Sequence, residues 1–280
     1  MSKQQSKRRT LEQVKEQYVI EKELALRLRN ATKKERRYLY TTLYDELFRR
    51  VPHHPQLTRK ADPKARSEAV SERVRLLRGF LNPKFTFMEV GSGNCELVFN
   101  IAKFVKQVYA VDVSEEITNS PRHPKNFKLI LSDGCSIPVP DNSVDMVYSN
   151  QLMEHLHPDD ALEQLRNIYR AITPGGVYLC ITPNRLSGPH DISKYFNHEV
   201  ATGFHLKEYT TMELTKMFKT AGFSKVFVLI NLKGILLELP VFSVRWIEEL
   251  LIRLPRLLSK RISRCRPIAL LLGIRLVGTK

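Results

Sequence analysis

The sequence predicts an α/β protein with one seven-stranded, mostly parallel sheet, an antiparallel last strand and helices on both faces. Short apolar runs alternate along the chain with segments of helical periodicity, and several runs end in an acidic residue or a glycine. The first of these runs ends in Glu89 and is followed by Gly91 and Gly93, and the second ends in Asp112. This order is typical of a βαβ unit that presents its strand ends to a ligand at one edge of the sheet.

Residues 1–80 are expected to form a basic tail and a helical cap ahead of this sheet. The tail is rich in lysine and arginine, and apolar side chains then recur at helical spacing from Leu39 to Val51. Because a residue that precedes proline disfavours helix, Pro52 should end this helix. Residues 63–80 should form a further helix that leads into the first strand.

The turn after the first apolar run has the chemistry of a ligand-binding loop. Gly91 and Gly93 can adopt backbone angles that other residues resist, and they let a ligand approach the N-terminus of the following helix closely. Asp112, at the tip of the next run, is placed to accept hydrogen bonds from two ribose hydroxyls. A tight turn without a ligand is the structural alternative. The pattern predicts binding of an adenosine-containing cofactor.

Five further apolar runs complete the predicted sheet. They are expected to form strands at residues 128–131, 144–148, 177–181, 225–230 and 274–278. The last of them should pair antiparallel inside the sheet. A helix over residues 165–172, closed by a turn that contains Gly175 and Gly176, should connect the fourth strand to the fifth.

Two more polar segments follow predicted strands, at residues 132–134 and within residues 145–155. Together with the loop at residues 89–93 and Asp112, they make the chain resemble the class I S-adenosylmethionine-dependent methyltransferases, the broad group that contains quinone-biosynthesis and other small-molecule enzymes. The resemblance implies a Rossmann-like fold, S-adenosylmethionine as the cofactor and no metal ion. One departure is Cys95, which stands where the family usually has a third loop glycine.

The resemblance also implies a protein contact for each part of the cofactor. The residues are Glu89, Gly91 and Gly93 for the methionine portion, Asp112 for the ribose, Asp133 and Gly134 for the adenine, and the Asn150 backbone for the amino group. The rival interpretation of the loop is a dinucleotide-binding fold, which needs a glycine three positions beyond the second loop glycine. Glu96 occupies that position, and its carboxylate would repel a pyrophosphate. S-adenosylmethionine is cationic, so the loop favours it.

The region after the fifth strand is expected to bind the methyl acceptor, because ligands in this fold lie at the carboxyl ends of the parallel strands. His190, Tyr195 and His205 are the candidate acceptor-binding residues. A hydroxyl acceptor would be helped by a general base, and imidazole suits neutral pH, so His155 and His205 are the candidate catalytic residues. Histidines at such positions can instead orient loops or cap helices, and an amine or carbon acceptor could need no base.

The predicted methyltransferase domain spans residues 81–280 and includes a long helical insertion, residues 233–267, between strands six and seven. The insertion combines apolar residues, the single tryptophan Trp246 and clustered cations. This pattern suits an amphipathic helix that rests on an anionic membrane surface. The alternative is a helical cap whose apolar stripe packs on the domain and whose arginines face water.

Composition limits the partners and the compartment. The formal net charge of +16 favours encounters with polyanions, without choosing among nucleic acid, acidic lipid and charged glycan. The four cysteines form no Cys-x-x-Cys pair, which argues against a disulfide framework or a zinc site and for a reducing compartment. The cytoplasm is therefore expected, or the inner face of the membrane if the insertion binds lipid. The sequence indicates no oligomeric state.

Taken together, these features predict an S-adenosylmethionine-dependent methyltransferase that acts on a small molecule. The expected acceptor is an oxygen of a sugar, a lipid-linked glycan or a quinone-like precursor. An RNA methyltransferase is the first alternative, because the chain is basic, although no RNA-binding module is recognisable. A non-catalytic protein that binds S-adenosylmethionine is the second alternative.

Overall fold

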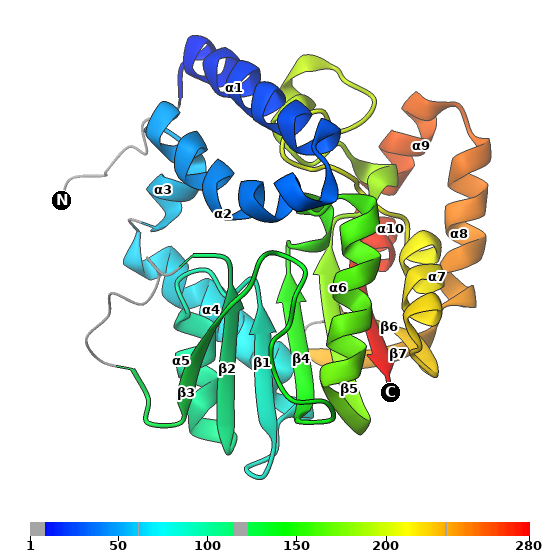
Figure 1. Cartoon of the computed structure of the whole chain (residues 1–280). Helices are drawn as coiled ribbons and strands as arrows, with labels where there is room; N and C mark the ends of the chain where they lie inside the picture. Colours follow the sequence, from blue (N-terminus) through cyan, green and yellow to red (C-terminus); the bar gives the residue numbers. More distant parts are fainter. Residues whose placement is uncertain (1–8, 61, 115–122, 233) are drawn as a thin grey trace, which may run out of the picture.

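An eight-stranded sheet forms the centre of the protein, as seen in the computed structural model (Figure 1). The structure describes residues 9–60, 62–114, 123–232 and 234–280, so most of the predicted basic tail lies outside it. The strands are β1 (Thr86–Val90), β2 (Gln107–Asp112), β3 (Phe127–Leu131), β4 (Val144–Asn150), β5 (Ile172–Thr182), β6 (Lys225–Leu232), β7 (Ile235–Pro240) and β8 (Ile274–Thr279). Their order in the sheet is β3-β2-β1-β4-β5-β8-β6-β7.

The predicted α/β class with a mostly parallel sheet is confirmed. Strands β1 to β5 run parallel to one another, and β8 pairs antiparallel with both β5 and β6. In β1, Val90 pairs with Val111 of β2 and with Ser149 of β4. Because the strands run in the same direction, the glycine loop, Asp112 and Asn150 leave the sheet at one edge.

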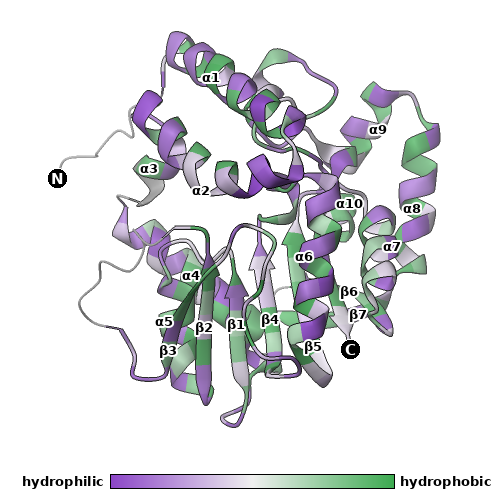
Figure 2. Ribbon diagram, viewed as in Figure 1, coloured by the Kyte–Doolittle hydropathy of each residue, from purple (hydrophilic) through white to green (hydrophobic). Residues whose placement is uncertain are grey.

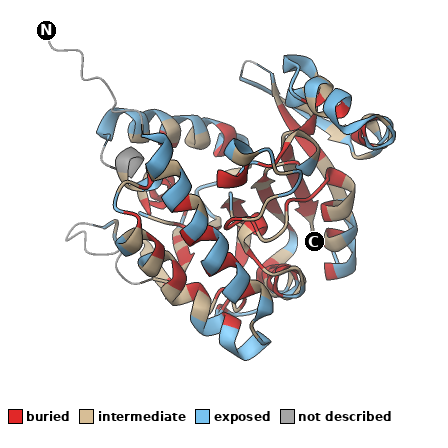
Figure 3. Ribbon diagram, turned by 90° about the horizontal axis from the view of Figure 1, so that it is seen from above, coloured by how far each residue is buried: buried red, intermediate tan, exposed pale blue. Residues whose placement is uncertain are grey.

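Alternating side chains give the sheet two buried faces. In β1, Phe87 packs with the helices α4 (Pro63–Leu77) and α5 (Glu96–Ile101), whereas the next residue, Met88, packs with the opposite cluster, which includes α6 (Pro158–Ala171) and α7 (Thr211–Ala221). This alternation is the period of two that a strand imposes on its side chains. From above, the central strands are buried and the outer sides of the helices are exposed (Figure 3).

The N-terminal cap consists of the long helices α1 (Leu11–Asn30) and α2 (Lys33–Arg50), followed by α3 (Pro55–Lys60) and α4. Thr10 and Thr32 begin α1 and α2, and each forms a capping box with a residue three positions later. Helices α1 and α2 lie across the carboxyl ends of the central strands (Figure 1). The predicted helix before Pro52 is therefore present and stands above the cofactor edge of the sheet.

The region predicted as a purely helical insertion begins instead with a strand. Gly234 adopts a positive φ of 96° and donates its N–H to Asn231 Oδ1, which closes a tight hairpin between β6 and β7. Strand β7 was not predicted, and with it the sheet has eight strands rather than seven. Helices α8 (Phe242–Arg253), α9 (Arg256–Ser263) and α10 (Arg266–Leu272) follow β7. None of the helices in the described residues is long and apolar enough to cross a membrane.

Candidate active site

The glycine loop after β1 holds the carboxylate of Asp112 beside it. Gly91 and Gly93 adopt positive φ angles of 75° and 53°. The N–H of Gly93 donates to Asp112 Oδ2 at 2.9 Å, and the N–H of Val113 donates to Oδ1 at 2.8 Å. Apart from the neighbouring residues in sequence, no heavy atom of the described residues lies within 4 Å of the position where a Cβ would stand on Gly93. The loop therefore presents an open backbone surface next to a fixed carboxylate.

Glu89 supplies a second, buried carboxylate at the end of β1. Its side chain is 3% exposed, and burial, opposed by Arg73 and reinforced by Asp112, raises its pKa to about 8. Its Oε2 atom has no hydrogen-bond partner among the described residues. Because a buried, unpaired carboxylate oxygen is costly, it is a fitting partner for an ammonium group. The edge of β1 therefore fits a cationic cofactor.

Asp133 and Gly134, predicted to face the adenine, already have partners inside the chain. Asp133 Oδ1 accepts from the N–H groups of Cys135 and Ser136, at 3.0 and 2.7 Å, and Oδ2 pairs with Arg37 Nε of α2 at 3.3 Å. A Cβ on Gly134 would lie 2.6 Å from the ring of Tyr40. The missing side chain at residue 134 thus allows α2 to approach the strand end, and the adenine contact stays a prediction.

Left-handed backbone appears at two non-glycine residues near the cofactor edge. Cys95, which replaces the third loop glycine, adopts a φ of 57° at the start of α5. Gln151 adopts the same φ directly after Asn150 and donates its N–H to Ile181 O at 2.8 Å. Such angles are uncommon for residues with a Cβ and often mark functional turns. These two residues closely follow the glycine loop and Asn150, which are the segments predicted to contact the methionine portion of the cofactor.

The two candidate catalytic histidines lie together. The rings of His155 and His205 meet edge to face with their centroids 4.9 Å apart. His155 Nδ1 lies 3.0 Å from the carbonyl oxygen of Phe204, and because a carbonyl only accepts, this nitrogen carries the proton. Burial, together with the charge of His205, lowers the pKa of His155 to about 3. His155 is therefore a neutral ring at physiological pH.

His205 has the opposite electrostatic environment. Its Nδ1 lies 2.7 Å from Glu208 Oε1, in a pair whose side chains are nearly fully buried. Burial acts to lower the pKa of His205, but the hydrogen bond to Glu208 and the nearby charges of Glu154 and Asp191 outweigh it, so the pKa is raised. His205 is thus the more basic histidine of the pair.

A buried carboxylate completes this cluster. Glu154 is 0% exposed, accepts a hydrogen bond from Thr182 Oγ1 at 2.8 Å, and has an Oε1 atom without a partner in the described part of the chain. One ligand-type atom each of Glu154, His155 and His205 lies within 4.8 Å of the others. Such a group can exchange a proton or bridge a cation, and the predicted absence of a metal stays a prediction.

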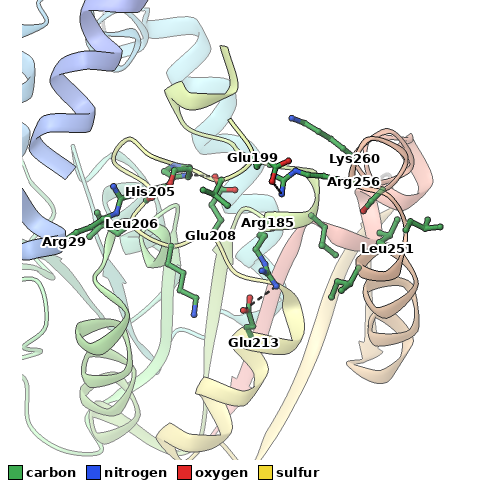
Figure 4. Close-up of a pocket in the computed structure, with 18 residues that line it drawn as sticks. Arg29, Arg185, Glu199, His205, Leu206, Glu208, Glu213, Leu251, Arg256 and Lys260 are labelled. Carbon is green, nitrogen blue, oxygen red and sulfur yellow. Dashed lines mark hydrogen bonds and ion pairs between the residues drawn. The ribbon is translucent and has the colours of Figure 1, made fainter. Parts of the chain in front are cut away.

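A pocket of about 490 Å³ is lined by His205 of this cluster (Figure 4). His205 and Glu208 lie at one side of it, and residues of α8 and α9 lie at the other. Its lining combines apolar side chains with cations, among them Arg29, Arg185, Leu206, Lys207, Leu251, Leu254, Arg256 and Lys260. The guanidinium of Arg29 also donates to four backbone carbonyls of residues 201–205, which connects α1 to this segment.

The other two predicted acceptor residues do not line this pocket. His190 Nε2 lies 3.0 Å from Asn184 O and 3.0 Å from Ser187 Oγ, and its ring lines a separate cavity of about 380 Å³. Tyr195 is 55% exposed and lines neither cavity. Of the three candidates, the structure therefore brings only His205 to the larger pocket.

Sequence reasoning missed the residue that anchors the insertion beside the pocket. Glu248 of α8 is 1% exposed, and its carboxylate accepts from the N–H groups of Thr211 and Met212 at the start of α7, at 2.7 and 3.1 Å. It also accepts from Asn184 Nδ2 at 2.8 Å. An acid at a helix N-terminus is favourable, but only the fold places Glu248 there, because α8 and α7 are distant in sequence.

Residues 88–180 match the family described as methyltransferase domain. A Mycolicibacterium smegmatis protein named as a probable S-adenosylmethionine-dependent methyltransferase is 31% identical over 138 residues, covering 49% of this chain and 51% of the relative. A Mycobacterium tuberculosis protein of the same description is 30% identical over 151 residues, with 52% of each chain covered. The chain thus spans about half the length of these curated relatives.

The fold also recurs in solved structures. Phosphoethanolamine N-methyltransferase 1 of Haemonchus contortus, solved with phosphoethanolamine and S-adenosylhomocysteine, aligns with a TM-score of 0.51 at 17% identity, covering 66% of this chain and 40% of that chain. This likeness establishes the shared fold. Residues 88–180 are therefore similar to a methyltransferase domain, and the curated relatives are named as probable S-adenosylmethionine-dependent methyltransferases.

Proposed function

We propose that the chain is an S-adenosylmethionine-dependent methyltransferase that methylates an oxygen of a small-molecule acceptor bound in the pocket beside His205. When bound, S-adenosylmethionine supplies a methyl group activated by its sulfonium. Glu89, Gly91, Gly93, Asp112, Asp133, Gly134 and Asn150 are the residues proposed to hold it. The unpartnered Glu89 Oε2 atom and the open backbone of Gly93 support this assignment.

The observation that carries the acceptor proposal is the pair formed by His205 and Glu208 at the wall of the pocket. Glu208 holds Nδ1 of the imidazole at 2.7 Å, which leaves Nε2 to take a proton from an acceptor hydroxyl. Its raised pKa makes His205 a stronger base than His155, whose pKa of about 3 is far below neutral pH. We assign His205 as the general base and His155 as the neutral ring that positions it.

The size and lining of the pocket support a small acceptor with an anionic part. A volume of about 490 Å³ lies within the range of ordinary small-molecule sites. Arg185 and Arg256 at its wall are paired with Glu213 and Glu199 at 3.6 and 3.5 Å, pairs that an acceptor phosphate or carboxylate could compete for. A sugar, lipid-linked glycan or quinone-like precursor remains the proposed acceptor class.

Transfer of a labelled methyl group tests the proposal. Purified protein and labelled S-adenosylmethionine are incubated with fractionated cell extract, and we expect label in the small-molecule or lipid fraction. The variant His205→Gln should lose most of this incorporation yet still bind S-adenosylhomocysteine, because the imidazole lies on the acceptor side. Label in RNA would favour the nucleic-acid alternative, and cofactor binding without transfer to any fraction would favour the non-catalytic one.

A further inference from the structure

The exposed apolar side chains of the protein are concentrated at the insertion. Nine of the sixteen exposed large apolar side chains among the described residues lie between Leu232 and Leu258. They are Leu232, Ile235, Leu237, Phe242, Trp246, Leu250, Ile252, Leu257 and Leu258. Leu257 is 86% exposed and Trp246 is 71% exposed, although such side chains are normally covered in soluble domains. Clustering of this kind marks an interaction surface.

Helix α8 has an outer side that no other part of the described residues covers. Val244, Glu248 and Leu251 are buried against the domain, so one side of the helix already packs on the core. Phe242, Trp246 and Leu250 recur at intervals of four residues and all face water. A helix with apolar residues on its inner side needs no second apolar stripe for folding. The outer stripe is therefore not explained by packing within the described residues.

Seven cations belong to the same three helices or to their connections. Arg245, Arg253, Arg256, Lys260, Arg261, Arg264 and Arg266 lie on or between α8, α9 and α10. Burial, with the charges of Arg264 and Arg256, lowers the pKa of Lys260, which shows how closely these cations are gathered. Polar and apolar residues are interspersed along α8 and α9 at one end of the molecule (Figure 2). We call the nine apolar side chains and these seven cations the β7–α9 face.

We infer that the β7–α9 face docks on the surface of an anionic lipid bilayer. Aromatic and aliphatic side chains enter the boundary between headgroups and acyl chains, and arginines and lysines bind acidic headgroups. A second copy of the chain fits the same face poorly, because an isologous contact would set the same seven cations against each other. Nucleic acid fits poorly as well, because an apolar stripe offers nothing to phosphates.

The pocket beside His205 opens next to this face. Leu251, Ile252, Leu254, Arg256 and Lys260 line the pocket and belong to α8, α9 or their connection. A docked bilayer would thus adjoin the pocket mouth, and an amphiphilic acceptor with an anionic headgroup could enter without crossing water. The entry of an amphiphilic acceptor names the acceptor class and rests on the proposed function. The docking of the face on a bilayer does not depend on that function.

Fluorescence of Trp246, the single tryptophan of the chain, tests the docking directly. Vesicles of phosphatidylcholine and phosphatidylglycerol at a ratio of about 7:3 should shift the emission to shorter wavelengths and carry the protein into the pellet. Vesicles of phosphatidylcholine alone, or added salt, should weaken both effects. Absence of shift and of sedimentation, in protein that is folded by circular dichroism, would overturn the inference.

Matched variants distinguish binding through the β7–α9 face from non-specific adsorption to vesicles. The double variant Leu250→Ser/Leu257→Ser keeps the tryptophan and should bind at least tenfold more weakly, and Arg253→Gln/Arg261→Gln should bind about thirtyfold more weakly. Leu11→Ser/Tyr38→Ser and Lys34→Gln/Arg49→Gln, which are also exposed but lie on α1 and α2, should bind as the unaltered protein does. Equal losses in both sets would overturn the assignment of the face.

Sedimentation equilibrium without lipid gives a further outcome. A dimer that Leu250→Ser/Leu257→Ser dissociates would identify a second copy as the occupant and would overturn the lipid inference. All these measurements omit cofactor and acceptor. Their failure would therefore leave the proposed methyl transfer intact, and a failure of methyl transfer would leave the docking result intact.

Discussion

His155 and His205 meet edge to face with their ring centroids 4.9 Å apart, although they belong to different connections of the sheet. Their pKa values are shifted in opposite directions, because burial dominates at His155 and Glu208 overcomes burial at His205. Divergent shifts in one cluster are typical of sites that divide acid–base roles. The arrangement predicts how methyl transfer depends on pH.

The rate of methyl transfer should rise with pH and level off above the pKa of His205, because the base must be unprotonated. That pKa lies above its ordinary value of 6.5. In Glu208→Gln, burial should prevail and move the rising limb to lower pH. Glu213→Gln, at another carboxylate of the same pocket, should leave the limb in place. Coincident pH–rate profiles for Glu208→Gln and the unaltered protein would contradict the assignment of His205.

Cofactor affinity should increase with pH through the titration of Glu89. The free protein holds this carboxyl largely protonated at pH 7, since burial raises its pKa to about 8, whereas an ammonium favours the carboxylate. Binding therefore releases a proton, and affinity for S-adenosylhomocysteine should rise by up to about tenfold per pH unit below pH 8. Calorimetry in buffers of different ionisation enthalpy measures this proton. Glu89→Gln should abolish it, and an unchanged proton release in that variant would remove Glu89 from the site.

The raised pKa of Glu89 also affects the stability of the unliganded protein, which should fall as pH rises, whereas cofactor affinity should increase. Glu89 has a higher pKa in the folded state than its ordinary 4.5, so its contribution to stability is present below that value and is lost as pH rises towards 8. Unfolding lets the carboxyl ionise. S-adenosylhomocysteine should therefore raise the thermal unfolding midpoint more at pH 8 than at pH 6.

Replacement of Asp112 by asparagine should weaken S-adenosylhomocysteine binding by about ten- to a hundredfold, the range expected from losing hydrogen bonds to a charged group. An amide oxygen can still accept from one of the two backbone N–H groups that Asp112 now serves, so the fold should survive. Titration calorimetry measures the affinity. Asp141→Asn, at an exposed carboxylate, is the control. Unchanged affinity in Asp112→Asn would rule out the proposed ribose contact.

The N-terminal cap should depend on one buried ion pair. Asp160 of α6 accepts from Arg36 Nε and Nη2, at 2.5 and 2.7 Å, and from Tyr40 Oη at 2.8 Å. Asp160→Ala leaves a buried cation without its partner and should lower the free energy of unfolding by about 3–5 kcal/mol. Glu163→Ala, which breaks the exposed pairs with Lys33 and Arg37, should cost less than about 1 kcal/mol. Urea unfolding compares the two, and equal losses would contradict the role of the buried pair.

Removal of divalent cations should leave methyl transfer unchanged. Glu154, His155 and His205 are close enough to bridge an ion, but a metal ion needs a neutral imidazole, and the raised pKa of His205 opposes the loss of its proton. Activity is compared before and after dialysis against a chelator. A loss of activity that added magnesium or zinc restores would instead make this cluster a metal centre.

The parts of the fold set by short-range pattern could be predicted from the sequence. The strand ending in Glu89, the glycine turn and the strand ending in Asp112 are encoded by neighbouring residues, and the structure contains them. Strand β7 was missed because residues 235–240 are apolar without alternation, and the prediction treated them as helix. Asn231 and Gly234 are the local signal that could have revealed its hairpin.

The candidate site was less predictable, because much of it depends on contacts between distant segments. Nothing near Glu208 in the sequence shows that it raises the pKa of His205 above that of His155. The packing of Tyr40 on Gly134 and the pair between Arg37 and Asp133 both require α2 to cross the strand ends. The local sequence pattern identified the two histidines as candidates, but tertiary packing determines that the pKa of His155 is lowered and that of His205 is raised.

The carboxylate of Glu248 couples the insertion to the rest of the molecule. Because it accepts from the first amides of α7 and from Asn184, α8 cannot swivel independently of the segment that leaves β5. A partner that binds the outer stripe of α8 therefore also fixes the orientation of the whole sheet. Such a rigid linkage would give every docked molecule the same tilt relative to the bilayer. The mouth of the pocket beside His205 would then always face the same direction.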